Sequence, residues 1–242
     1  PLTNFSWYNK IKFSNKLKEI FELHINQYED ENQISKSINS ISKVEDRVSI
    51  KVKKQYEENP YPRWENVGLS IEPRNIKEVI NNSDLNLDLK EIRNAESPVI
   101  LIAGCGTGQH AITTASKYKK SKILALDLSF KSLSYAKRKA NELKINNIDF
   151  IQGDILDLEL IDRKFDIIES VGVLHHMDNP FKGWKILTSC LNNDSLMLIG
   201  LYSEKARQHI AQIKNKINKL KLQSNYTNII KFRKDLIENN ND

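Results

Sequence analysis

The sequence predicts an α/β fold built around a parallel sheet. Between about Ser97 and Leu201, short apolar runs alternate with segments of helical periodicity. The first run, Val99–Ala103, shows no polar alternation, which is typical of a strand buried on both faces. It leads directly into glycines at positions 104, 106 and 108, and then into a predicted helix over 110–118. A strand, a glycine turn and a helix in this order are typical of the entrance to a nucleotide site.

The rest of the alternating core follows in order. We expect strands over 123–126, 150–154, 165–170 and 195–200, with helices over 131–143 and 180–191. Helical periodicity returns over 204–222 and 226–237.

Three parts are predicted along the chain. Residues 1–64 form a helical extension, residues 65–96 a connector, and residues 97–242 the core. The extension ends in a segment with Tyr56, Tyr61 and Trp64 around two prolines. These aromatic side chains either form a lid over the site or pack as a helix end against the core.

The spacing of the glycines limits which class of nucleotide ligand the site can bind. The pattern is G-x-G-x-G, whereas dinucleotide sites have G-x-G-x-x-G, and no Lys-Ser or Lys-Thr pair follows as in a P-loop. Asp127 ends the second strand about 20 residues further on, where an acid can hold ribose hydroxyls. Asp154, followed by the apolar Ile155, ends the third strand and can bond an adenine amino group.

These segments, together with Glu169–Met177, resemble in order and spacing the class I S-adenosylmethionine-dependent methyltransferases. The resemblance implies a doubly wound, Rossmann-like sheet with strand order 3-2-1-4-5. Gln55–Trp64 and Gly200–Glu204 also resemble a bacterial methyltransferase group that is often fused to tetratricopeptide repeats.

The resemblance implies S-adenosyl-L-methionine as the cofactor and assigns residues to it. The residues expected to bind it are Gly104, Cys105, Gly106, Thr107, Gly108, Gln109, Asp127, Leu128, Asp154, Ile155, Ser170 and Val171. His175, or its neighbour His176, is the candidate general base. The other interpretation is that these histidines bond backbone or only shape the acceptor pocket.

The composition argues against a membrane protein, a metalloprotein and a nucleic-acid-binding protein. No apolar run approaches the roughly 20 residues that cross a bilayer, so we expect no membrane partner. Two cysteines and no zinc-ligand spacing predict a reduced, cytoplasmic protein without metal. The net charge is +6, with lysines crowded near the end, but aromatic residues are not interleaved with them. We therefore interpret the lysines as a solvated helix face and not as a nucleic-acid groove.

The chemical class of the methyl acceptor can be limited only by excluding alternatives. Glu169-Ser170-Val171-Gly172 stands where amino-methylating enzymes of nucleic acids resemble one another in an Asn- or Asp-Pro-Pro-aromatic run. We therefore expect a small-molecule or carrier-bound acceptor, with protein or RNA methylation and an NAD-dependent oxidoreductase as weaker alternatives.

The sequence lacks the two strands that usually close this sheet, and it begins with Pro1, so we expect a piece of a longer protein. A protein partner or the missing C-terminal segment would then cover the sheet edge. The same absence leaves a non-catalytic interaction module as the alternative function.

Overall fold

The computed structural model describes residues 5–7, 14–82, 96–223 and 225–239. The chain forms two compact units, Pro1–Leu201 and Tyr202–Asp242. The boundaries expected at residues 64 and 96 stay predictions. Of the predicted extension and connector, residues 1–4, 8–13 and 83–95 lie outside the described part.

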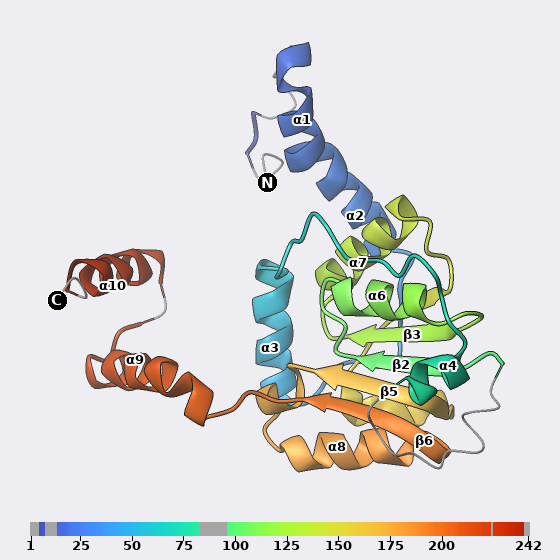
Figure 1. The fold of residues 1–242 in the computed structure, drawn as a ribbon. Coiled ribbons are helices and arrows are strands. Elements are labelled where there is room, and N and C mark those ends of the chain that lie inside the picture. Colours follow the sequence, from blue (N-terminus) through green and yellow to red (C-terminus); the bar gives the residue numbers. More distant parts are fainter. Residues whose placement is uncertain (1–4, 8–13, 83–95, 224, 240–242) are drawn as a thin grey trace. The chain divides into compact units, whose positions relative to one another are not determined.

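The first unit is built on a six-stranded sheet in which all paired strands run parallel (Figure 1). In chain order the strands are β1 (Asn39–Ser40), β2 (Val99–Ala103), β3 (Lys122–Asp127), β4 (Ile148–Gln152), β5 (Phe165–Val171) and β6 (Leu191–Gly200). Their order in the sheet is β1-β4-β3-β2-β5-β6. The predicted order of the five core strands is therefore confirmed.

Helices cover both faces of the sheet (Figure 1). They are α4 (Ile76–Asn81), α6 (Gln109–Lys117) and α7 (Phe130–Glu142) on one face, and the 3₁₀ helix η5 (Ile155–Ile161) and α8 (Pro180–Ser189) on the other. Each face of the sheet packs against its helices in a hydrophobic core, and alternate residues of β2 belong to the two cores. Ile100 and Ile102 face α6, while Leu101 and Ala103 face α8. All four are at most 1% exposed, as the unbroken apolar run predicts.

The expectation of a wholly helical extension is wrong at one place. The extension contains α1 (Lys18–Phe21), α2 (Gln27–Ser35) and α3 (Arg47–Glu58), but it also adds β1 to the sheet beside β4. The Ser40 hydroxyl donates a 2.5 Å hydrogen bond to the Gln152 side chain and fastens this strand. A strand of two residues has no periodicity, so no pattern in the sequence indicates it.

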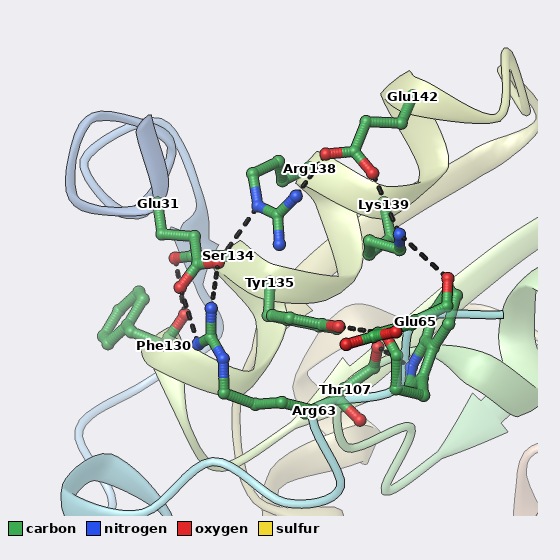
Figure 2. Close-up of polar contacts among 11 residues, drawn as sticks. Glu31, Arg63, Glu65, Thr107, Phe130, Ser134, Tyr135, Arg138, Lys139 and Glu142 are labelled. Atoms are coloured by element: carbon green, nitrogen blue, oxygen red, sulfur yellow. Dashed lines mark hydrogen bonds and ion pairs between the residues drawn. The ribbon is translucent and has the colours of Figure 1, made fainter. Parts of the chain in front are cut away.

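A buried carboxylate ties the extension to α7. Glu31 of α2 accepts two hydrogen bonds from the Arg63 guanidinium, at 2.9 and 2.8 Å, and a third from Arg138 Nε at 3.0 Å (Figure 2). The ring of Tyr135 lies 4.5 Å from the Arg63 guanidinium and 5.0 Å from that of Arg138. The two guanidinium groups therefore compensate the burial of the Glu31 charge, and the face of the Tyr135 ring contacts both cations.

The same network reaches the glycine turn through Trp64. Its indole Nε1 donates to the Thr107 carbonyl at 3.0 Å, and its own carbonyl accepts from the Tyr135 hydroxyl. Trp64 is 8% exposed and packs in a core cluster with Ile112 and Tyr135, whereas Tyr61 is 75% exposed. Trp64 is thus packed against the core and is not part of an open lid.

The second unit is helical. It contains the 3₁₀ turn η7 (Lys205–Arg207), α9 (Gln208–Lys219) and α10 (Tyr226–Asn239). Within the described residues no strand follows β6, as the sequence predicts. No helix in this described part has the length and apolar character needed to cross a membrane.

Replacing Glu31 by Gln is expected to destabilise the first unit by about 3–5 kcal/mol, since it leaves two arginines without their buried anion. The matched control is Glu58→Gln, which removes an exposed pair with Lys54 at 3.9 Å and should cost at most about 1 kcal/mol. Chemical unfolding of both variants measures the difference. Equal losses would show that the Glu31 network does not hold the extension in place.

Candidate functional site

The glycine turn joins β2 to α6 over residues 104–108. Gly104, Gly106 and Gly108 have φ values of +78°, +53° and +85°, which side-chain-bearing residues rarely adopt. The amides of Gly104 and Cys105 both donate to the Leu126 carbonyl, at 2.8 and 2.9 Å, and hold the turn against the end of β3. A Cβ atom on Gly106 would meet no atom within 4 Å, so the turn has open space there.

Asp127 ends β3 directly beside this turn. Its carboxylate accepts from the Gly106 amide at 2.8 Å and from the Ser129 amide at 2.9 Å. Burial raises the pKa of Asp127, and the nearby Glu57 adds to this effect, while the two amides oppose it. The side chain is therefore a desolvated acceptor held in a fixed orientation.

Asp154 follows the end of the next strand, β4, by two residues and is 4% exposed. Its Oδ1 accepts from the Leu156 amide at 3.0 Å and caps η5. Its Oδ2 is buried and has no hydrogen-bond partner among the described residues. Ile155 beside it is 6% exposed. A buried acceptor without a donor is costly, which marks Asp154 as a place where a ligand can donate.

The end of β5 opens toward solvent. Ser170 is buried with its hydroxyl unpaired among the described residues, whereas Val171 is 47% exposed. The chain then turns through Gly172, at φ +75°, into the 3₁₀ turn η6 (Leu174–His176). The rings of His175 and His176 lie with their centroids 4.2 Å apart and are tilted by 45°.

Most predicted site residues thus follow the carboxyl ends of four adjacent parallel strands, β4-β3-β2-β5. Hydrogen bonds join the ends of β4 and β3. The Gly153 backbone amide donates to the Asp127 carbonyl at 3.0 Å, and the Gln152 side-chain amide donates to the Leu128 carbonyl at 3.1 Å. This edge is where ligands bind in open parallel sheets.

Two residues of the glycine turn, and Gln109 directly after it, direct their side chains elsewhere. The Thr107 hydroxyl donates to the Pro62 carbonyl of the extension at 2.6 Å, and the Gln109 side-chain amide donates to the Asn66 carbonyl of the connector at 3.5 Å. Cys105 is buried, and burial raises the pKa of its thiol well above the usual value. Only their backbone remains for a ligand, and a protonated thiol is no nucleophile.

Helix α3 lies across the carboxyl ends of the strands (Figure 1). Glu57 accepts a 2.5 Å hydrogen bond from the Phe130 amide at the start of α7. Tyr56 meets His176 edge-on at 6.4 Å between ring centroids. Sequence reasoning named Tyr56 but missed Glu57, since a glutamate near a helix end has no distinguishing signal.

Sequence reasoning also missed a buried cluster beneath the turn. Glu169 of β5 accepts from the Thr114 hydroxyl and from His110 Nε2, both at 2.8 Å. Burial opposes ionisation of Glu169, but the contacts with His110 and Thr114 outweigh it and lower the pKa of the carboxyl.

A surface pocket elsewhere is unrelated to this site. Its lining includes Arg74, Glu78, Asn82 and Lys119, near the far end of α6, where Arg74 bridges to Tyr118. In the part of the chain that the structure describes, no group of three or more His, Cys, Asp or Glu residues could hold a metal ion.

The family model for a methyltransferase domain matches residues 96–238, which includes every strand end described above. The chain belongs to the class I S-adenosylmethionine-dependent methyltransferases. The cofactor of this methyltransferase is S-adenosylmethionine.

Parts of this chain are similar to individual proteins. The methyltransferase is 34% identical over 121 residues to an uncharacterized protein from Synechococcus, covering 50% of this chain and 29% of that protein. It is 30% identical over 116 residues to (S)-coclaurine N-methyltransferase from Papaver somniferum, covering 48% and 32%. PKMT2 from Rickettsia typhi, solved in complex with AdoHcy, is 27% identical with a TM-score of 0.45, covering 50% and 24%. The matched region is therefore about a third or less of each of these proteins.

The residues present fit the cofactor. The open space at Gly106 leaves room for a ligand against backbone, and Asp127 offers an oriented acceptor beside it. The buried, unpaired Oδ2 of Asp154 suits an amino-group donor.

Two glycine substitutions are expected to separate binding from folding. Gly106→Ala places a methyl group in the open space and should weaken S-adenosylhomocysteine binding at least tenfold, with a stability loss of about 1–2 kcal/mol from the left-handed backbone. Gly108→Ala carries the same backbone cost, but its Cβ would lie 2.4 Å from Ala136 Cβ, so it should lose more stability.

Isothermal titration and chemical unfolding measure the two effects. The assignment of the binding surface is wrong if Gly106→Ala binds S-adenosylhomocysteine as tightly as the original chain.

Proposed function

We propose that this chain transfers a methyl group from S-adenosylmethionine to a small-molecule or carrier-bound acceptor. The observation that carries the proposal is the buried, unpaired Asp154 Oδ2 on the same sheet edge as Asp127 and the open glycine turn. When bound, the cofactor supplies an activated methyl group on its sulfonium.

We assign the cofactor-binding roles as follows. The Asp127 carboxylate accepts from the ribose hydroxyls, with Leu128 beside the adenine. Asp154 Oδ2 accepts from the adenine amino group, and Ile155 flanks the ring. Gly104, Gly106 and Gly108, with the backbone of Cys105, Thr107 and Gln109, line the ribose and methionine part. Ser170 and Val171 lie beneath the sulfonium.

The acceptor is proposed to enter between α3 and the turn after β5. Val171 is exposed there, and Tyr56 and His176 form an aromatic wall beside it. The name (S)-coclaurine N-methyltransferase indicates a small-molecule acceptor for that relative, which supports the same class here.

Catalysis then rests mainly on alignment. Holding donor and acceptor in line can supply on the order of 7–11 kcal/mol of the barrier. Burial lowers the pKa of His176, so its imidazole is neutral at neutral pH and able to accept a proton. His175 and His176 are both proposed at the mouth of the site, and an acceptor that must lose a proton would use one of them.

One observation favours the alternative of a non-catalytic interaction module. In the described part of the chain β6 is an edge strand, and its Leu198 is 50% exposed. A partner protein that covers this edge would make docking the function.

We also propose a cytoplasmic location for this chain. Both free cysteines are buried, which is consistent with a reducing compartment.

The proposed function predicts that the chain binds S-adenosylhomocysteine, with weak or no binding of NAD. Titration calorimetry with both ligands measures this. A panel of amine, hydroxyl, thiol and carboxyl acceptors, with radiolabelled S-adenosylmethionine as donor, then tests turnover. Ligand binding without turnover on any small or carrier-bound acceptor would favour the interaction module, whereas tight NAD binding alone would contradict the proposal.

The two histidines should differ in the pH profile of turnover. If His176 is the base, His176→Asn lowers kcat by about 10²–10⁴-fold on an acceptor that must lose a proton. Because the pKa of His176 is lowered, activity of the original chain should persist below pH 6.5 and fall only at more acidic pH.

His175→Asn serves as the matched variant. If it removes the acidic limb of the profile and His176→Asn does not, then His175 is the base.

A further inference from the structure

The buried Glu169 carboxylate lacks a full complement of partners. Glu169 is 7% exposed, and its Oε2 accepts the hydrogen bonds from His110 and Thr114. The Oε1 atom accepts no hydrogen bond from the described residues, and none of the described lysines or arginines lies within 4 Å of the carboxylate. Although burial opposes it, His110, Thr114 and the charge of Lys117 together lower the pKa of this carboxyl, so Glu169 is ionised at neutral pH. Its Oε1 atom remains an acceptor that a ligand cation can use.

The register of the sheet places Glu169 next to the cofactor site. Glu169 of β5 pairs with Ile102 of β2, two residues before Gly104, and parallel neighbours project to the same face. His110 is the second residue of α6 and follows the glycine turn by two positions. The carboxylate therefore lies just beneath the glycine turn, on the α6 side of the sheet.

The order of the strands indicates which end of the cofactor comes near. Asp154 on β4 and Asp127 on β3 are proposed for the adenine and the ribose, so the ligand runs along β4-β3-β2. The strand that continues this direction is β5, which carries Glu169. The end of the cofactor opposite the adenine carries an α-ammonium group, a cation of the size and donor capacity that Glu169 lacks.

We propose that Glu169, oriented by His110 and Thr114, binds the α-ammonium group of the cofactor. This inference rests on the proposed function and adds a residue to its binding site. Charge-assisted hydrogen bonds to an ammonium would use the Oε1 lone pairs, while the two bonds at Oε2 hold the carboxylate against α6.

The test uses ligands with and without the amino-acid end. Glu169→Gln is expected to weaken S-adenosylhomocysteine binding by about 10–100-fold, the range of a charged hydrogen bond, measured by titration calorimetry. The affinity for 5′-methylthioadenosine, which lacks the ammonium, should not change. A decarboxylated S-adenosylhomocysteine keeps the ammonium and should lose as much affinity as the intact ligand.

The matched control is Asp166→Asn on the same strand. Asp166 lies at the other end of β5, where its carboxylate accepts from the Val99 amide and from the Asn192 side chain, both at 2.8 Å. Its replacement should leave unchanged the ratio of the affinities for S-adenosylhomocysteine and 5′-methylthioadenosine. If Glu169 only braces α6 against β5, Glu169→Gln will also leave this ratio unchanged, and the inference is overturned.

Failure of the proposed function and failure of the variant to fold can both be told apart from failure of the inference. If the original chain binds no S-adenosylhomocysteine, the proposed function fails and the inference fails with it. If Glu169→Gln does not fold, Glu169→Asp keeps the charge but withdraws it by one methylene. It should then weaken S-adenosylhomocysteine alone by about 3–10-fold, on the same scale of charged hydrogen bonds, and an unchanged ratio would overturn the inference.

Discussion

The hydrogen bond from the Gly106 amide to Asp127 is the contact on which the rest of the site depends. It joins the middle of the glycine turn to the end of the neighbouring strand, and it uses an amide that only a left-handed backbone can direct there. The same turn is held by two amides on the Leu126 carbonyl. Because the turn is fixed from β3, the space over Gly106 exists before any ligand arrives, which is preorganisation in the sense that favours binding.

The extension contributes to this preorganisation through a chain of buried polar contacts. Glu31 holds Arg63, Arg63 precedes Trp64, and Trp64 bonds the carbonyl of Thr107 within the glycine turn. Arg138 on α7 shares the same carboxylate. The extension therefore supports the glycine turn, and a loss of the Glu31 charge would reach the turn through consecutive residues.

What the sequence could predict was local or periodic. The apolar runs gave the five core strands, and the acids at their ends gave Asp127 and Asp154, because strand ends of a parallel sheet meet at one edge. The pairing of Glu31 with Arg63 and of Glu169 with His110 joins residues far apart in the chain, and no spacing rule connects them. Strand β1 is too short for periodicity, and the side chains of Thr107 and Gln109 bond the extension and the connector for reasons of tertiary packing alone.

The charge at this site is opposite in sign to that of the whole chain. The net charge is +6, yet Asp127, Asp154, Glu57 and Glu169 all lie around the carboxyl ends of the strands. At close range in a desolvated site, local charges outweigh the average of a solvated surface. A ligand that carries both a sulfonium and an ammonium, as the cofactor does, matches the sign of this local charge.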